Sequence, residues 1–222
     1  QDKHGLDMRV GTEPEMMWLK RGEDGRPNGG VTKPNCYHID QFEELRPTFM
    51  KVIEYSQAMG LDIIQGDHED APGQLELNTM FDDVLRNADR LTTYRQICAQ
   101  VAREDGLIAC FMSKPFMGVS ASGCHHNMSL WRGGVDKVND LHFASLPGME
   151  GAFTYRSEGE NTFMPDPSID ERKPGPIGLQ CIGGVMKHLD ALTSIGSSTV
   201  NSYRRLWDTG FWAPVFADWG YQ

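Results

Sequence analysis

The chain has 222 residues, of which 39% are hydrophobic, so it is long enough to form one large domain with a packed core. Aspartate and glutamate outnumber lysine and arginine by 31 to 21, which gives a formal net charge of −10. That charge repels phosphate backbones, and no apolar run has the length of a membrane helix, so we expect no nucleic-acid partner and no membrane partner. The N-terminus lacks the pattern of a signal peptide, which predicts a cytoplasmic protein.

The first third of the chain predicts a strand, a loop and a helix. Residues 10–18 alternate as a strand does, which puts Glu13 and Glu15 on one side of it. Pro14 lies on the other side and predicts a strand start, an edge or a bulge, because proline cannot donate to a strand ladder. Residues 21–38 hold too many glycines and prolines for a regular element. We expect a helix from about Pro47, with proline in its first turn, to Gly60.

The middle of the chain predicts short strands around one long helix. A strand over residues 61–65 leads to a loop that contains Glu69 and ends in a Pro-Gly turn. Residues 74–78 follow as a half-buried strand, in which polar side chains alternate with two leucines. Apolar residues at helical spacing predict the longest helix from Thr79 to about Arg103, and an apolar strand follows over 107–112.

The last part of the chain predicts fewer regular elements. A flexible loop over residues 114–123 leads to a strand over 125–131, which aligns His125 with Asn127 and Ser129. We expect residues 132–176 to form a loop with one short strand at most. A helix is predicted over residues 177–195, and residues 200–206 lead from it to an aromatic cluster that includes Trp212. The five widely spaced cysteines predict buried free thiols rather than disulfides.

Three of these strands share an unusual composition on their polar faces. Each presents carboxylates, an imidazole, amides or a hydroxyl, with few lysines or arginines to neutralise them. For a single strand, the ordinary interpretation is a solvated face of an antiparallel sheet. Carboxylates that cluster repel one another unless a positive group lies between them, and oxygen ligands with one imidazole suit Mg²⁺ or Mn²⁺. The sequence therefore predicts a divalent-cation site.

Four segments also resemble the catalytic domain of glutamine synthetase, in the family's order and over nearly the whole chain. The resemblance implies an α+β fold, with a curved, mostly antiparallel sheet backed by helices. It also implies that residues 1–222 are one partial catalytic domain, which lacks the family's small N-terminal domain and its C-terminal remainder. The segments are residues 68–76 (HEDAPGQLE), 13–15 (EPE), 199–206 (TVNSYRRL), and Lys114-Pro followed by 122–125 (SGCH) and Ser129.

The family resemblance implies an activity and a set of site residues. Glutamine synthetases use ATP to phosphorylate the γ-carboxylate of glutamate, and an amine then displaces the phosphate, with divalent cations offsetting the charge. The resemblance implies a homo-oligomeric ring, with a dodecamer as the expected state. It assigns Glu15, Glu69 and Glu76 to one cation (Mg²⁺ or Mn²⁺), Glu13 and His125 to another, Arg205 to the substrate glutamate, Ser120, Ala121 and Gly123 to substrate binding, and Asn127 and Ser129 to the nucleotide.

Several of these residues have simpler interpretations. Glu69 could cap a turn, since loop acids often do so. His125 could be a hydrogen-bonded interior histidine, although its place on the acidic face favours a ligand. Arg205 could belong to an ordinary solvated pair with Arg204, although a guanidinium suits bidentate carboxylate binding.

The sequence departs from the ammonia-using pattern at positions that bear on the amine. Asn127 stands where the family often has a second histidine, and Ser120-Ala121 stands where it often has Asn-Gly. Trp212 stands where a carboxylate usually closes the ammonium site, and an indole offers an apolar wall with a cation-attracting face. The chain is thus similar to the γ-glutamylmethylamide synthetase branch, which joins methylamine to glutamate. A glutamine synthetase, a γ-glutamylpolyamine synthetase and a non-catalytic scaffold remain the alternatives.

Overall fold

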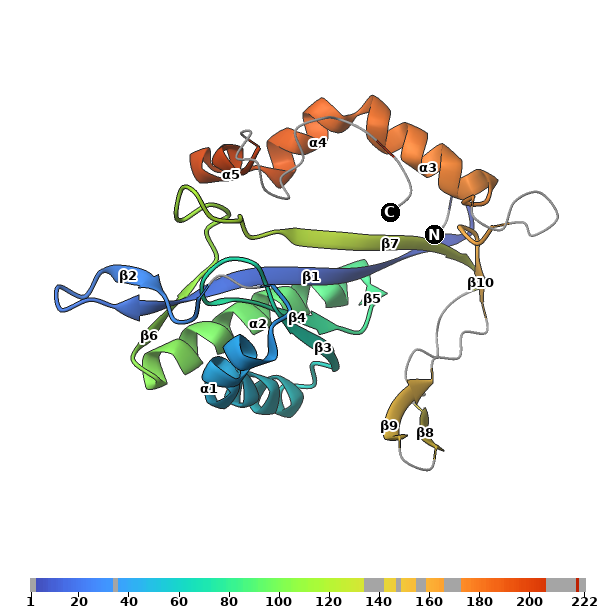
Figure 1. Ribbon diagram of the computed structural model, residues 1–222. Helices are drawn as coiled ribbons and strands as arrows, with labels where there is room; N and C mark the ends of the chain where they lie inside the picture. Colours follow the sequence, from blue (N-terminus) through green and yellow to red (C-terminus); the bar gives the residue numbers. More distant parts are fainter. Residues whose placement is uncertain are drawn as a thin grey trace.

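The computed structural model describes residues 3–33, 36–133, 142–146, 149–154, 159–165, 173–206 and 219. Within these ranges an eight-stranded antiparallel sheet runs through the molecule, with helices on both of its sides (Figure 1). The sheet is built around β1 (Leu6–Arg21), a strand of 16 residues that changes partners along its length. Its partners are β7 (Cys124–Arg132), β5 (Asp82–Asp83), β4 (Gln74–Thr79), β6 (Leu107–Cys110) and β2 (Pro27–Gly30), while β3 (Ile63–His68) pairs with β4 and β10 (Glu160–Asn161) pairs with β7.

Pro14 lies inside β1, at the position where the strand changes partners. It is opposite Cys124, the first residue of β7, and the next residue, Glu15, is the first to pair with β4. The prediction of a strand start or edge at Pro14 was therefore wrong. The missing N–H of proline is tolerated here because one ladder ends where the next begins.

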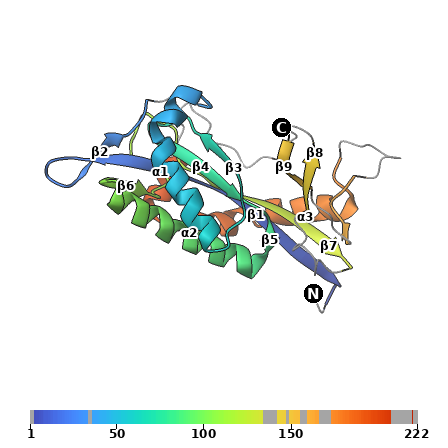
Figure 2. The ribbon, with the colours of Figure 1, turned by 90° about the horizontal axis from the view of Figure 1, so that it is seen from below.

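Two long helices cover one face of the sheet. Figures 1 and 2 show α1 (Ile39–Ala58) and α2 (Val84–Glu104) side by side beneath β1 and β4. The main core fills the space between these helices and the sheet. Its buried residues from the sheet and the segment before β3 are Met16, Trp18, Leu61, Leu75 and Leu77, and those from the helices are Leu45, Phe49, Val52, Tyr94, Ile97, Cys98, Val101 and Ala102.

Both helices begin at positions that differ from the predictions. α1 begins at Ile39 and continues through Pro47, because the buried Leu45, Phe49 and Val52 hold its two halves on the same core. α2 begins at Val84, since Thr79 ends β4 and the Asp83 side chain caps the helix by accepting the Arg86 N–H at 2.9 Å.

Replacing Pro47 with alanine is expected to raise the free energy of unfolding by about 1–2 kcal/mol. Alanine restores an N–H that can donate to the Glu43 carbonyl, and it removes the clash of the proline ring with that turn. Pro47 is exposed, so no core packing is lost. Chemical denaturation measures the change, with the exposed Glu54→Ala in the same helix as the control. A Pro47→Ala protein less stable than this control would contradict the expectation.

The C-terminal half is more regular than predicted. Residues 142–146 and 149–154 form β8 (His142–Leu146) and β9 (Met149–Thr154), which pair antiparallel, so the expectation of at most one short strand was wrong. Such short strands depend on pairing that local patterns reveal poorly. The predicted helix over 177–195 is divided at His188 into α3 (Pro176–Lys187) and α4 (Leu189–Gly196).

These helices and α5 (Val200–Arg205) follow one another along the side of the sheet opposite α1 and α2 (Figure 1). Among the residues that the structure describes, no helix is long and apolar enough to span a bilayer.

Candidate functional site

The sheet separates an apolar face from an acidic one. Residues Met16, Trp18, Leu75 and Leu77 of β1 and β4 point into the core between the sheet and helices α1 and α2. Their neighbours in the sequence point to the opposite face because side chains alternate along a strand. Glu15 of β1 is opposite Glu76 of β4, and Glu13 is opposite His125 of β7. Cross-strand partners share a face, so three strands bring these four side chains together.

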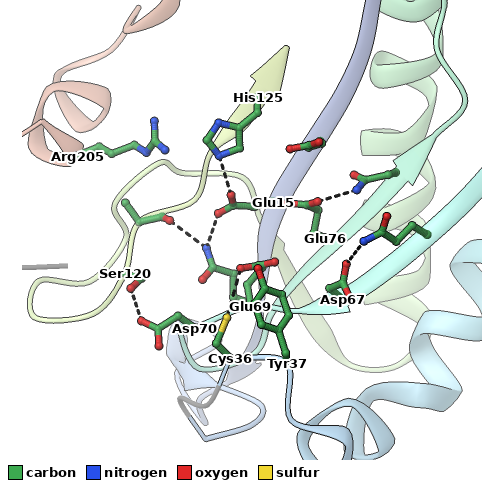
Figure 3. Close-up of a pocket in the computed structure, with 15 residues that line it drawn as sticks. Glu15, Cys36, Tyr37, Asp67, Glu69, Asp70, Glu76, Ser120, His125 and Arg205 are labelled. Atoms are coloured by element: carbon green, nitrogen blue, oxygen red, sulfur yellow. Dashed lines mark hydrogen bonds and ion pairs between the residues drawn. The ribbon is translucent and has the colours of Figure 1, made fainter. Parts of the chain in front are cut away.

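The acidic face forms the floor of a cavity of about 580 Å³ (Figure 3). Carboxylates dominate its lining, and Arg205 and His125 are the described residues there that can carry positive charge. The lining residues are Glu13, Glu15, Cys36, Tyr37, Gln65, Asp67, Glu69, Asp70, Gln74, Glu76, Asn78, Ser120, Ala121, His125 and Arg205.

Glu69 reaches this cavity from the turn between β3 and β4. Its N–H donates to the Gln74 carbonyl at 2.8 Å, which closes the turn. Gly73 adopts a φ of +68°, and a Cβ there would lie 2.4 Å from the carbonyl oxygen of Trp18. Only glycine fits a position that requires both a positive φ and this close approach to β1. The Pro-Gly turn of the sequence motif thus places Glu69 beside β1.

The crowding of carboxylates perturbs their protonation. Burial, with added repulsion from Glu15 and Glu76, raises the pKa of Glu69 to about 7. Burial likewise raises the pKa of Glu76, and the hydrogen bond from Asn78 only partly offsets this effect. The pKa of His125 is raised chiefly by its hydrogen bond to Glu15, at 3.2 Å. The cavity therefore favours added positive charge, either as protons or as cations.

The residues present fit a hard divalent cation. Carboxylate oxygens with one imidazole are ligands that Mg²⁺ and Mn²⁺ accept. The buried Oδ1 of Asn78 has no hydrogen-bond partner within the described part of the chain, although the Asn78 amide donates to Glu76 at 2.7 Å. Among the described residues, no three His, Cys, Asp or Glu side chains are already grouped tightly enough to hold an ion.

A loop over residues 113–123 connects the acidic face to the helix that carries Arg205. The Asn201 side chain of α5 accepts the Lys114 N–H at 2.8 Å and donates to the Lys114 carbonyl at 2.7 Å. At the other end of the loop, the Ser120 hydroxyl donates to Asp70. A Cβ on Gly123 would lie 2.7 Å from His125 Nε2, 2.9 Å from Glu15 Oε1 and 3.1 Å from Arg205 Nη2. A side chain at this position would thus have to displace the ends of these three converging side chains.

Most of the predicted site residues meet at this cavity. Gly123 borders it, and the others that line it are Glu13, Glu15, Glu69, Glu76, Ser120, Ala121, His125 and Arg205. The predicted nucleotide residues do not line it. Asn127 donates to Glu13 at 2.7 Å, and Ser129 accepts a hydrogen bond from the Trp131 indole at 2.8 Å. Trp212 lies outside the described residues.

Sequence reasoning missed several residues at the cavity. Asp70 follows Glu69 in the same motif, and Asp67 precedes it at the strand period of two, so both carried a usable signal. Cys36 and Tyr37 come from the segment predicted as an irregular loop and carried none. The Cys36 sulfur lies 3.9 Å from Glu69 Oε2. All five cysteines are free, as predicted, but the prediction that they are buried holds only for Cys98 and Cys110, because Cys36 and Cys181 are partly exposed and Cys124 is exposed.

Comparisons with known proteins identify relatives over nearly the whole chain. The glutamine synthetase of Rhizobium leguminosarum bv. phaseoli is 33% identical over 206 residues, which are 92% of this chain and 41% of the relative. The glutamine synthetase of Pyrococcus furiosus is 31% identical over 224 residues, which cover 100% of this chain and 43% of the relative. The chain therefore spans less than half the length of these relatives.

Solved structures confirm the predicted fold class of a curved antiparallel sheet backed by helices. Ligand-free GmaS matches with a TM-score of 0.71 at 28% identity, over 91% of this chain and 42% of that one. The GmaS complex with ADP matches with a TM-score of 0.72 at 27% identity, over 96% of this chain and 43% of that one. The family model described as glutamine synthetase, catalytic domain, matches residues 1–143 and 154–222. The chain therefore belongs to the glutamine synthetase family.

Proposed function

We propose that the protein containing this chain is an ATP-dependent ligase that joins an amine to the γ-carboxylate of glutamate. One observation carries the proposal. Three strands and one turn bring Glu13, Glu15, Glu69, Glu76 and His125 to a single cavity, with Arg205 on its wall. Membership of the glutamine synthetase family supports the reaction class.

The proposed roles follow from the chemistry of each side chain. Glu15, Glu69 and Glu76 would hold one Mg²⁺ or Mn²⁺ ion, and Glu13 with His125 would hold another. When bound, these ions would neutralise the phosphates of ATP and the charge that develops as the phosphoryl group is transferred. Asn127 and Ser129 are proposed nucleotide contacts, and the ADP complex of the GmaS relative supports a nucleotide site.

Arg205 and the 113–123 loop would position the amino-acid substrate. A guanidinium can bind a carboxylate through two parallel hydrogen bonds, which fixes orientation as well as charge. Ser120, Ala121 and Gly123 line or border the same cavity and would contact glutamate there. The γ-carboxylate oxygen would attack the γ-phosphorus of ATP and release ADP, and the amine nitrogen would then attack the acyl carbon and release phosphate.

Methylamine is the amine that we propose first. The match to GmaS, a γ-glutamylmethylamide synthetase, supports it. So does the family resemblance, which puts Trp212 where a carboxylate usually closes the ammonium site. Ammonia is the second candidate, because the curated relatives are named glutamine synthetases. We also propose that residues 1–222 are part of a catalytic domain that assembles into a homo-oligomeric ring, with a dodecamer as the expected state.

A coupled assay of ATP turnover on the full-length protein tests the choice of amine. Glutamate with methylamine is expected to support faster turnover than glutamate with ammonium, by about 5-fold to 150-fold, because one methyl group in an apolar pocket contributes about 1–3 kcal/mol. Mass spectrometry of the product should show γ-glutamylmethylamide. Equal or greater turnover with ammonium would exclude methylamine as the preferred substrate.

Calorimetric titration with Mn²⁺ separates the ligase from a non-catalytic scaffold. A scaffold gains little from clustered carboxylates whose charge is not neutralised, whereas a ligase needs them for cations. Full-length protein that is folded but binds no Mn²⁺ would favour the scaffold.

A further inference from the structure

Gln74 is a buried residue of β4 whose amide lies within hydrogen-bond distance of four partners in three separate segments. Only 1% of its surface is exposed. Its Oε1 accepts the N–H of Ala71 at 2.9 Å, which fixes the orientation of the amide. Its Nε2 lies 3.1 Å from each of three acceptors, namely Glu15 Oε2, the Ala121 carbonyl oxygen and Ser122 Oγ. A residue so placed joins the turn of Glu69, strand β1 and the 113–123 loop.

The amide of Gln74 distinguishes the two oxygens of Glu15. Glu15 Oε2 accepts from Gln74 Nε2 and also from the Gly123 N–H at 2.9 Å. Glu15 Oε1 instead faces His125 Nε2 at 3.2 Å, on the cavity side (Figure 3). Two protein donors thus occupy one oxygen and leave the other directed toward the proposed cation site. Hydrogen bonds to a charged acceptor are the stronger kind, so this arrangement resists rotation of the carboxylate.

The same amide also holds the 113–123 loop against β1. The Gly123 N–H donates to Glu15, and the Glu15 N–H donates to the Gly123 carbonyl at 3.1 Å. Gln74 adds the bonds to Ala121 and Ser122, just before this pair. A shift of Gln74 would therefore move both a cation ligand and the loop that borders the substrate cavity.

We propose that Gln74 is a positioning residue, which restricts Glu15 to coordination through Oε1 and couples the cation site to the 113–123 loop. The proposal rests on the function proposed above, because it gives Gln74 a task only if Glu15 binds a cation. Its geometric part, the fixing of Glu15 and Gly123, can be tested without any metal.

The test compares Gln74→Glu and Gln74→Met with Gln65→Glu in the full-length protein. Gln65 lines the same cavity but is exposed, and its side chain donates to Asp67 at 2.6 Å rather than to Glu15. Gln65→Glu therefore adds the same charge without removing a hydrogen bond to Glu15. Gln74→Met has a similar length with no charge and no hydrogen bond, and it decides the question if Gln74→Glu fails to fold. Val52→Ala, at a buried position of α1 in the main core, supplies a loss of stability away from the cavity.

The first readout is hydrogen exchange at the Gly123 N–H in metal-free protein. Protection at this amide is expected to fall about 10-fold or more in both Gln74 variants, because the Glu15 acceptor is no longer fixed. In Gln65→Glu and Val52→Ala it should fall no more than at other amides of the sheet. The second readout is Mn²⁺ affinity by calorimetry, which should weaken about 10-fold or more in the Gln74 variants relative to both controls.

The outcomes separate this inference from the proposed function. A wild-type protein that is folded but binds no Mn²⁺ overturns the cation site and, with it, the role given to Gln74. Mn²⁺ binding that is strong in the wild type and equally strong in Gln74→Met and Val52→Ala overturns the positioning role alone. Unchanged protection at Gly123 in Gln74→Met overturns the geometric part.

Discussion

Replacing Glu76 with glutamine is expected to weaken Mn²⁺ binding by about 100-fold, because it removes one of the charged ligands of a site built from carboxylates. The same change is expected to raise the free energy of unfolding of metal-free protein at pH 8 by about 1 kcal/mol. Glu76 is 8% exposed and lies near Glu15 and Glu13, so its charge is unfavourable without a cation. A glutamine has the same shape and can accept the hydrogen bond from Asn78.

Calorimetric titration and chemical denaturation of one preparation measure these two effects. Glu44→Gln is the matched control, since it removes the same charge at an exposed position of α1, away from the cavity lining. It should change neither Mn²⁺ affinity nor stability by an amount comparable to Glu76→Gln. If Glu76→Gln destabilises the metal-free protein and leaves Mn²⁺ affinity unchanged, Glu76 has a structural role and the cation site is wrong.

Opposite signs for binding and stability are the signature of a functional site. A purely structural carboxylate would be expected to have a positively charged partner, as Asp82 has in Arg9, Arg86 and Arg90 near the start of α2. No ion pair with Lys or Arg is found for Glu76 among the described residues, and the neighbouring charges that raise its pKa are carboxylates. Evolution retains such an arrangement where another property outweighs the loss of stability.

The sequence predicted the acidic face well because that face depends on local periodicity. Alternation along residues 10–18 and 74–78 fixes which side chains share a side, whatever the strand pairs with. The strand pairings were harder to predict. The change of partner at Pro14 depends on Cys124, where β7 begins, and on Glu76 of β4, both of which are more than 50 residues away in sequence. The same limit explains the late start predicted for α1, since the packing of Leu45 and Phe49 on the core outweighs the local cost of Pro47.

The cavity also contains residues that no pattern could have revealed. Tyr37 lies at the cavity because its N–H donates to the His68 carbonyl at 2.8 Å, at a φ of +56° that is rare for a tyrosine. That conformation depends on tertiary contacts rather than on the sequence of the loop. Gln74 could be placed on the polar face from its spacing, but its hydrogen bonds to Glu15 and the 113–123 loop required the fold.

The second large expected effect concerns pH and the removal of metal. The pKa of Glu69 is raised from its ordinary value of 4.5 to about 7. Between these two pH values the folded protein keeps a proton on Glu69, whereas the unfolded chain has released it. Stability from this group is fully present below pH 4.5 and is lost as the pH rises to about 7. The raised pKa values of Glu76 and His125 act in the same direction. The lowered pKa values of Asp83, Glu104 and Asp105 act only in more acidic solution.

Metal-free protein is therefore expected to lose roughly 2 kcal/mol of stability between pH 5 and pH 8, after allowance for the partial exposure of Glu69. Mn²⁺ at 100 times its dissociation constant should restore about 2.7 kcal/mol at pH 8. At pH 5 the same concentration should restore much less, because protons compete for the carboxylates. Denaturation curves in EDTA and in Mn²⁺ at both pH values measure these differences.

Glu69→Gln tests whether Glu69 is the source of the pH dependence. The variant cannot titrate at this position, so its metal-free stability should change less between pH 5 and pH 8 than that of the wild type. It should also release fewer protons on binding Mn²⁺ at pH 7, which calorimetry in buffers of different ionisation enthalpy detects. If the variant retains the full pH dependence, another carboxylate of the cluster holds the proton. The cation then displaces the proton from that carboxylate and not from Glu69. Because the proton and the cation would occupy the same carboxylates, the fall in metal-free stability and the gain in Mn²⁺ affinity must occur over the same pH range.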